Sequence, residues 1–99
     1  MTVDLLLLPE AQHDLVEAYN WYEDRRAGLG EEFLSCIEAR IEAICRTPEL
    51  YPKVYEDFRR ALVRRFPYEI FYEYSAGRVI VYSIFHASRN PDKWRSRLV

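Results

Sequence analysis

The fold is decided by residues 59–94, which read RRALVRRFPYEIFYEYSAGRVIVYSIFHASRNPDKW. This stretch contains three runs rich in aromatic and β-branched residues, a glycine turn and half of the chain's basic side chains. The residues before it have the periodicity of two amphipathic helices. Together they predict a two-layer domain in which helices cover one face of a sheet and leave the other face open.

The strands of this stretch can be paired in register from their turns. The segment Ser75-Ala76-Gly77 predicts a three-residue hairpin loop with glycine at a position of positive φ. The predicted inward pairs are Tyr72–Ile80, Ile70–Tyr82 and Tyr68–Ile84, extended by Val63–Ile70 and Ala61–Tyr72 through a tight turn at Phe66-Pro67. The alternate positions pair Arg64–Glu69, Leu62–Phe71 and Arg60–Glu73. The register was chosen from the apolar residues alone, and it also places two pairs of opposite charge across the strands. This agreement supports the register.

The open face of this predicted sheet combines arginines with an apolar stripe. Its members are Arg60, Leu62, Arg64, Glu69, Phe71, Glu73, Val79, Val81 and Phe85. We expect a partner to cover this stripe, with Arg89 and Trp94 of the basic tail contributing to the partner-binding set. The alternative is that the C-terminal tail folds back over the face, with Trp94 pinning it to the sheet edge.

The N-terminal segment predicts a strand followed by a helix. Residues 3–8 form an apolar run that suits a strand buried on both faces. Pro9 is favourable in the first turn of the helix that follows. Arg25, Arg26 and Gly28 are typical of a helix end, so this helix is expected to stop there.

A second helix is expected to begin at residues 29–31 and to end at Arg46, because Thr47-Pro48 cannot continue it. The short link between the helices favours an antiparallel hairpin, and residues 48–53 predict a loop. The expected fold class is α+β: a small, antiparallel-dominated sheet with an N-terminal strand and an α-helical hairpin packed on one face, in a single domain of residues 1–99.

Composition and charge narrow the function classes. With 49% hydrophobic residues the chain can bury a core without metals or disulfides, and we expect no metal or other cofactor. Residues 1–58 carry a net charge of −8 and residues 59–99 one of +6. The acidic half is explained by Glu-rich helix surfaces. The basic half predicts a surface that meets an acidic partner or a phosphate backbone.

Cysteine usage and hydropathy point to a reducing, cytoplasmic setting. Cys36 and Cys45 lie nine positions apart in one predicted helix, on opposite sides of it, so they cannot bridge to each other. We expect Cys45 in the core and Cys36 to be a partly exposed free thiol. The leucine run at residues 5–8 is too short to span a bilayer, so no membrane contact is expected.

Several short motifs carry a resemblance to a known family. They are Asp14-Leu15, Tyr19, Trp21-Tyr22, Pro48, Tyr51-Pro52, Arg59-Arg60, Phe66-Pro67-Tyr68, Ile70, Tyr72, Ile84, His86, Arg89, Pro91 and Trp94. With the element order, they make the chain similar to the RelE/ParE superfamily of bacterial type II toxin–antitoxin toxins. The strings RRALVRRFPYEIFY and IFHASRNPDKW most resemble the ParE branch, whose members are often named plasmid stabilisation proteins.

The resemblance implies a small toxin held inactive by a cognate antitoxin, in a homodimer or a heterotetramer with that antitoxin. In the family, the C-terminal segment of the antitoxin wraps the toxin and lays helix and strand into the groove of the sheet. ParE toxins poison DNA gyrase, whereas RelE toxins cleave messenger RNA on the ribosome. The ParE reading implies a binding poison that meets nucleic acid only through its target. A third possibility is a non-toxic homologue that serves only to bind an antitoxin.

The enzyme alternative is a metal-independent endoribonuclease. Such chemistry needs a base, an acid and cations around the phosphate. The best set in this sequence is His86 with Arg89 and Arg65. RelE-like ribonucleases resemble one another in a lysine-rich middle strand or in an acid–histidine–terminal-tyrosine set, whereas this chain has two lysines and ends in valine. We therefore lean away from an enzyme and expect His86 to bond locally and order the turn that follows it.

Overall fold

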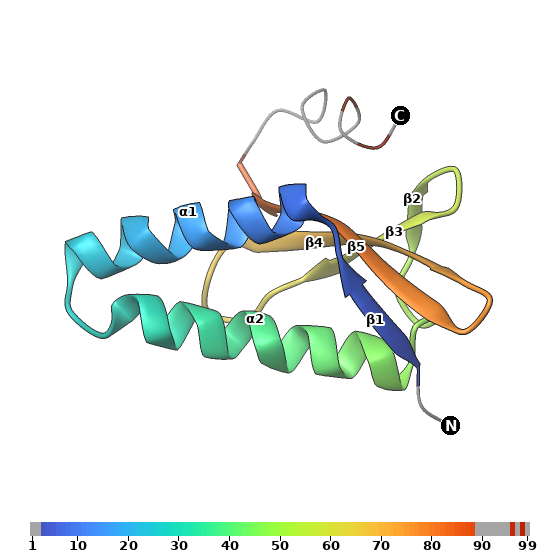
Figure 1. The fold of residues 1–99 in the computed structure, drawn as a ribbon, viewed down its shortest axis with the longest axis horizontal. Coiled ribbons are helices and arrows are strands. Elements are labelled where there is room, and N and C mark those ends of the chain that lie inside the picture. The colour runs from blue at the N-terminus through green and yellow to red at the C-terminus, as the bar shows by residue number, and fades with distance from the viewer. Residues whose placement is uncertain (1–2, 89–95, 97, 99) are drawn as a thin grey trace.

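A computed structural model describes residues 3–88 together with residues 96 and 98 (Figure 1). The elements along the chain are β1 (Asp4–Leu7), α1 (Pro9–Arg25), α2 (Leu29–Arg46), β2 (Lys53–Tyr55), β3 (Phe58–Leu62), β4 (Tyr68–Ser75) and β5 (Arg78–His86). The strands form one sheet in the order β1-β5-β4-β3-β2, antiparallel except for β1 with β5. The helices lie side by side against one face of it (Figure 1). The predicted α+β fold class is confirmed.

Both helices begin and end at the predicted residues, and contacts at the turn between them stabilise the start of α2. Glu23 of α1 accepts hydrogen bonds from the backbone amides of Gly28 at 2.8 Å and Gly30 at 2.9 Å. A carboxylate therefore caps the free N–H groups at the start of α2. A Cβ at Gly30 would stand 2.8 Å from the carbonyl oxygen of Tyr19, so the close approach of the two helices requires glycine there.

The β4–β5 hairpin closes through a shorter loop than predicted. Ala76 and Gly77 are its two loop residues, with φ values of 52° and 73°. This left-handed pair is typical of the two-residue turns whose twist matches that of the flanking strands. Ser75, which was expected in the loop, pairs with Arg78 instead. One residue fewer in the loop exchanges the faces of the first residues of β5.

A β-bulge at Tyr82 restores the predicted parity further along β5. Ile70 pairs with Ile84 and Tyr72 pairs with Val81, so β5 holds one more residue than β4 between these two pairs. The predicted pairs of this hairpin are wrong. Ile70, Tyr72 and Ile84 nevertheless lie in the core beneath the helices, as expected.

Val79 and Val81 face the helices because they precede the bulge. Both are fully buried in the same cluster as Phe33 and Ile37 of α2. The prediction that these two valines lie on the open face is therefore wrong. Tyr82, predicted to point inward, packs on the opposite face of the sheet.

β3 pairs with β4 two residues away from the predicted register. The observed pairs are Arg60–Phe71, Ala61–Ile70 and Leu62–Glu69. Because the shift is even, Ala61 is still buried in the core, and Arg60 and Leu62 still lie at the alternate positions. The predicted partners of these three residues are wrong, since residues 63–67 make a longer connection than a tight turn.

The predicted Arg60–Glu73 and Arg64–Glu69 pairs are replaced by one ion pair between Arg60 and Glu69, with an N–O distance of 3.5 Å. Burial raises the pKa of the Glu69 carboxyl, and the Arg60 guanidinium partly opposes this shift. Arg64 lies beyond the end of β3 and is exposed. The second predicted cross-strand ion pair therefore does not form.

The face that was expected to be open carries a second apolar cluster. Its buried members are Phe58, Phe71, Phe85 and Leu98, with Val54, Tyr55 and Tyr82 packed against them. Phe71 and Phe85 expose 0% and 4% of their surface, so the prediction that they are exposed is wrong. Leu98 comes from the C-terminal end, in agreement with the alternative that the tail folds back over this face.

β1 is an edge strand rather than the doubly buried strand that its leucines predict. Among the described strands it pairs with β5 alone, and Leu5 and Leu6 expose 46% and 44% of their surface. At the other edge, β2 begins at Lys53, the last residue of the predicted loop 48–53. The sheet thus ends in two short strands.

Cys36 and Cys45 are free thiols on α2, and both are half-buried. Burial raises the pKa of the Cys45 thiol. Neither of the two described helices combines the length and the apolar character needed to cross a bilayer. Within residues 3–88, 96 and 98, no group of three or more histidine, cysteine or acidic side chains is arranged to bind a metal ion.

Candidate functional site

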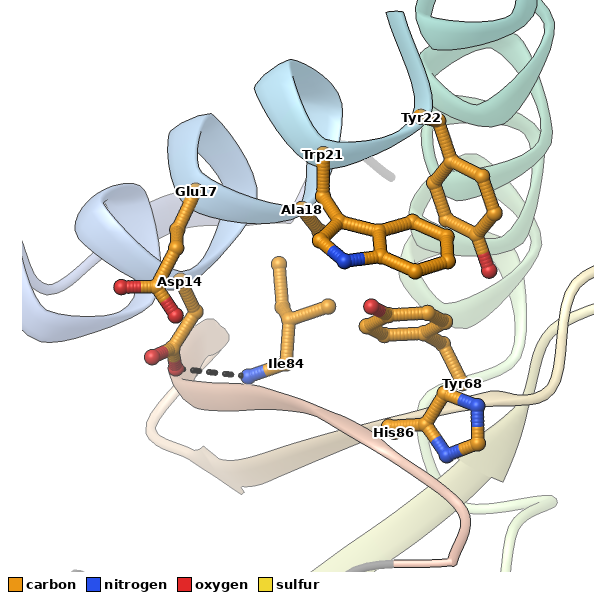
Figure 2. A pocket seen from close by; sticks show the side chains of 8 residues that line it. All are labelled: Asp14, Glu17, Ala18, Trp21, Tyr22, Tyr68, Ile84 and His86. Carbon is orange, nitrogen blue, oxygen red and sulfur yellow. Dashed lines mark hydrogen bonds between the residues drawn. The ribbon is translucent and has the colours of Figure 1, made fainter. Parts of the chain in front are cut away.

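A pocket of about 270 Å³ lies between α1 and the end of β5 (Figure 2). Its lining residues are Asp14, Glu17, Ala18, Trp21, Tyr22, Tyr68, Ile84 and His86. Figure 2 shows the two carboxylates on one side of the hollow and His86 with the aromatic rings on the other. We call it the α1–β5 pocket.

Asp14 ties the helix layer to the sheet at the floor of this pocket. Its Oδ2 atom accepts a hydrogen bond from the backbone amide of Ile84 at 3.1 Å (Figure 2). The β1–β5 pairing stops at Leu7 with Val81, and Ile84 lies beyond it on the same strand. A side-chain carboxylate thus satisfies a backbone donor that the short edge strand does not reach.

His86 is held by its neighbours in the chain and by an aromatic ring. Its Nδ1 atom accepts a hydrogen bond from the backbone amide of Ser88 at 3.1 Å and lies 2.7 Å from the Ser88 hydroxyl. A backbone N–H can only donate, so Nδ1 carries the lone pair and the neutral ring carries its proton on Nε2. The ring meets Tyr68 edge-on at 5.3 Å. The predicted local bond is therefore present at Ser88.

Aromatic side chains form the remaining wall of the pocket. Trp21 and Tyr22 meet edge-on at 5.1 Å, and Tyr22 and Tyr68 do so at 6.1 Å. The guanidinium of Arg25 lies 3.8 Å from the centre of the Trp21 ring. Burial raises the pKa of the Tyr22 hydroxyl, which stays neutral at physiological pH. The pocket therefore offers carboxylates, hydroxyls and ring faces.

Arg65, one of the two arginines of the proposed catalytic set, does not line this pocket. Arg65 donates to Glu32 of α2 at 2.7 Å and lines a separate groove. Arg89 lies outside the described residues. Arg59 donates to the carbonyl oxygens of Glu49 and Tyr51, at 3.1 and 2.6 Å, and so ties the loop before β2 to β3. Among the residues that the structure describes, those that share the pocket with His86 include two acids and no cation.

The predicted partner-binding residues separate into three groups. Arg60, Leu62 and Arg64 reach the surface, and Leu62 exposes 58% of its area. Phe71, Val79, Val81 and Phe85 are buried. Arg89 and Trp94 lie outside the described residues.

An apolar groove of about 490 Å³ lies where β1 meets the two helices. Its lining residues are Val3, Leu5, Leu7, Leu15, Leu34, Ile37, Glu38, Ile41, Glu42 and Cys45. We call it the β1 groove. Sequence reasoning missed it because four consecutive leucines predict a buried strand; only the position of β1 at the sheet edge leaves Leu5 half-exposed.

The fold is shared with solved structures from bacterial toxin–antitoxin systems. The chromosomal ParDE TA system from P. aeruginosa superposes with a TM-score of 0.79 at 13% identity, covering 88% of this chain and 98% of that chain. The toxin–antitoxin complex RelBE2 from Mycobacterium tuberculosis gives 0.62 at 15% identity, covering 87% and 99%. The isolated E. coli RelE toxin gives 0.57 at 13% identity, covering 98% and 99%. Identities this low show the fold alone.

The chain thus has the fold that these RelE and ParE structures share. No curated protein matches the chain in sequence. The family model described as ParE toxin of type II toxin-antitoxin system, parDE, matches residues 5–91, and the chain belongs to this family. The predicted resemblance is confirmed.

Proposed function

We propose that this ParE-family toxin acts by binding a protein target, DNA gyrase, and that a cognate antitoxin neutralises it. The observation that carries the proposal is the position of His86, which shares its pocket with Asp14 and Glu17 and lies apart from Arg65. Family membership supports the toxin–antitoxin setting. A gyrase poison and its antitoxin would meet in the cytoplasm.

The electrostatics of the α1–β5 pocket disfavour RNA cleavage there. Phosphoryl-transfer chemistry gains most from cations placed where negative charge develops. Among the described lining residues, the charged groups that face His86 across the pocket are two carboxylates, which offer a phosphodiester no such stabilisation. The acids and aromatic rings of the pocket instead support a surface that recognises a protein.

The β1 groove is the proposed antitoxin site. Antitoxin-like segments bind toxins of this kind as an added strand or as a helix in a groove. In the described part of the chain no strand pairs with the outer edge of β1, and Leu5 and Leu7 line the apolar groove beside it. Of the residues first expected to bind the antitoxin, Arg60, Leu62 and Arg64 stay in the proposal because they reach the surface.

Induction of the toxin alone in bacterial cells tests the proposed target. We expect filamentation and DNA damage while messenger RNA stays intact, and we expect His86→Ala to keep its toxicity. Cleaved messenger RNA that disappears in His86→Ala would identify a ribonuclease instead. Harmless induction of a protein that still binds its antitoxin would leave only the antitoxin-binding role.

A further inference from the structure

We propose that the α1–β5 pocket holds the guanidinium of an arginine side chain that a partner protein presents. The inference rests on the proposed function, in which this pocket recognises a protein, and it names the chemical group that the pocket selects. The pocket has a volume of about 270 Å³, slightly below the range that whole small-molecule ligands occupy. A volume of this size suits one long side chain better than a complete cofactor.

The charged groups that line the pocket attract a cation. Among the described lining residues these groups are the carboxylates of Asp14 and Glu17, which Figure 2 shows on the same side of the hollow. The hydrogen bond from Ile84 fixes the orientation of the Asp14 carboxylate, which can accept further hydrogen bonds. Glu17 lies 3.5 Å from Nε2 of His13, and its side chain exposes 63% of its surface, so a partner can reach it from solvent. A guanidinium presents several N–H donors in a fork that matches carboxylate oxygens.

The rings on the other side of the pocket favour a flat cation. Trp21, Tyr22 and Tyr68 line that side, and the faces of such rings attract positive charge. Trp21 already holds one guanidinium of this chain, since that of Arg25 lies 3.8 Å from the ring centre. A guanidinium stacks on rings in this way and leaves water more easily than the compact, strongly hydrated ammonium of lysine. The rings therefore favour arginine over lysine.

The walls of the pocket are held in place by contacts within the chain. Tyr22 packs against Phe33 of α2 at 5.1 Å, and Tyr68 meets His86 edge-on at 5.3 Å. Because Nδ1 of His86 accepts the backbone amide of Ser88, the imidazole is neutral and adds no positive charge to the pocket. Side chains that their neighbours already hold lose little freedom on binding, so a single arginine can be recognised at a low cost in entropy.

A titration followed by NMR tests which group the pocket selects. The reporter is the backbone amide of Ile84, which donates to Asp14 at the floor of the pocket. The amide of Gly77, in the hairpin loop at the opposite end of β5, is the internal control. The probes for the full, isotope-labelled chain are an acetylated and amidated Gly-Arg-Gly peptide, the same peptide with lysine or citrulline for arginine, and free L-arginine. Citrulline has the shape of arginine without its charge.

We expect the arginine peptide to shift the Ile84 amide signal saturably and to leave the Gly77 signal unchanged. The citrulline peptide should bind at least about ten-fold more weakly, because its hydrogen bonds to the carboxylates are not assisted by charge. The lysine peptide should bind about three-fold more weakly, since its ammonium does not stack on the rings. Free L-arginine brings a carboxylate of its own into an acidic pocket, so it should also bind more weakly than the capped peptide.

Substitutions of exposed residues in the full chain provide matched controls. Glu17→Gln is expected to weaken binding of the arginine peptide about five-fold. Glu38→Gln removes the same charge from α2, outside the pocket, and should leave the affinity unchanged. Trp21→Leu removes a ring face and should weaken binding about three-fold. Circular dichroism checks that each variant is folded.

Equal binding of the arginine and citrulline peptides, equal effects of Glu17→Gln and Glu38→Gln, or an Ile84 signal that no probe shifts would each overturn the proposal. Tighter binding of the lysine peptide would overturn the choice of a guanidinium, and equal binding of free L-arginine would overturn the choice of a protein as its source. The outcome is separate from that of the induction experiment. DNA damage in cells without a shift at Ile84 would remove this inference alone, whereas cleaved messenger RNA with a saturable shift would remove the gyrase proposal alone.

Discussion

The carboxylate of Asp14 in α1 accepts a hydrogen bond of 3.1 Å from the backbone amide of Ile84 in β5. The two residues are seventy positions apart in the sequence. Ile84 lies three residues beyond Val81, the partner of the last paired residue of β1, so a side chain from α1 takes this amide where the edge strand has already ended. Because it joins the helix layer to the sheet, it helps to hold the floor of the α1–β5 pocket in place.

Removing this carboxylate is predicted to destabilise the fold. Asp14→Ala leaves a partly buried amide without its acceptor, which costs about 1–3 kcal/mol of unfolding free energy. Asp14→Asn keeps an acceptor oxygen and is expected to lose less. Urea denaturation provides the measurement, with Asp24→Asn on the exposed side of the same helix as the control. An Asp14→Ala protein as stable as the control would contradict this role.

Tyr72 is predicted to make stability fall at high pH. Its hydroxyl donates to the carbonyl oxygen of Pro48 at 2.6 Å, and burial raises its pKa to about 12. Between the unfolded pKa of about 10 and this value, the unfolded chain releases a proton that the folded chain keeps, so stability decreases as the pH rises through this range. Urea midpoints from pH 9 to pH 12 should fall more steeply in the wild type than in Tyr72→Phe.

At neutral pH, Tyr72→Phe is expected to cost about 1–2 kcal/mol, because the Pro48 carbonyl loses its partner. Tyr55→Phe, in the edge strand β2, serves as the matched control. Parallel pH profiles of the wild type and Tyr72→Phe would show that another group titrates in this range.

Ala76 is predicted to be a site where stability can be gained. Its φ of 52° places an alanine in the left-handed region, next to Gly77 in a two-residue turn. Ala76→Asn creates the Asn-Gly pair that such turns favour, so we expect a gain of about 0.5–1 kcal/mol in unfolding free energy. Gly77→Ala at φ 73° should lose about 1 kcal/mol. A destabilised Ala76→Asn protein would argue against this turn geometry.

Substitutions at two leucines with nearly equal exposure test the proposed antitoxin site. Leu5 and Leu6 expose 46% and 44% of their surface, but only Leu5 lines the β1 groove. Leu5→Glu is expected to weaken antitoxin binding by a factor of roughly 100 or more, since it puts a charge into an apolar contact. Leu6→Glu should weaken it far less. Titration calorimetry with the antitoxin measures both, and equal losses would remove the groove from the proposal.

Phe71 marks where reasoning from the sequence failed. An exposed Phe71 would make Phe71→Glu a selective binding variant with an intact fold. The residue is fully buried beside Phe85 and Leu98, so we expect Phe71→Glu to unfold the protein, at a cost of several kcal/mol. Loss of the cooperative thermal transition is the readout. A folded variant that no longer binds antitoxin would restore the first interpretation.

The candidate site was only partly predictable. His86 stands out in the sequence because histidine is the side chain most often used for proton transfer. Asp14 and Glu17, which share the pocket with His86, do not stand out in the sequence. They lie some seventy residues earlier, on what looks like an ordinary polar helix face. The position of Asp14 beside the apolar stripe of α1 is a weak indication that its side chain faces the sheet. Nothing in the local sequence indicates that it accepts a hydrogen bond from β5.

The helices and most of the strands follow from local sequence patterns. Capping residues, prolines and the 3.6-residue period act within a few positions, so Pro9, Gly28 and Thr47-Pro48 predict the helix boundaries correctly. The inward faces of Ala61, Ile70 and Tyr72 also follow from alternation alone.

Long-range packing, by contrast, selects the face on which Val79, Val81 and Tyr82 lie, and it places β1 at the edge of the sheet. A two-residue turn and a one-residue bulge are both compatible with this local sequence. The choice depends on how the whole hairpin packs beneath the helices. Because side chains alternate with a period of two, a loop shorter by one residue is enough to move two valines from the surface into the core, and the bulge then returns the rest of β5 to the predicted parity.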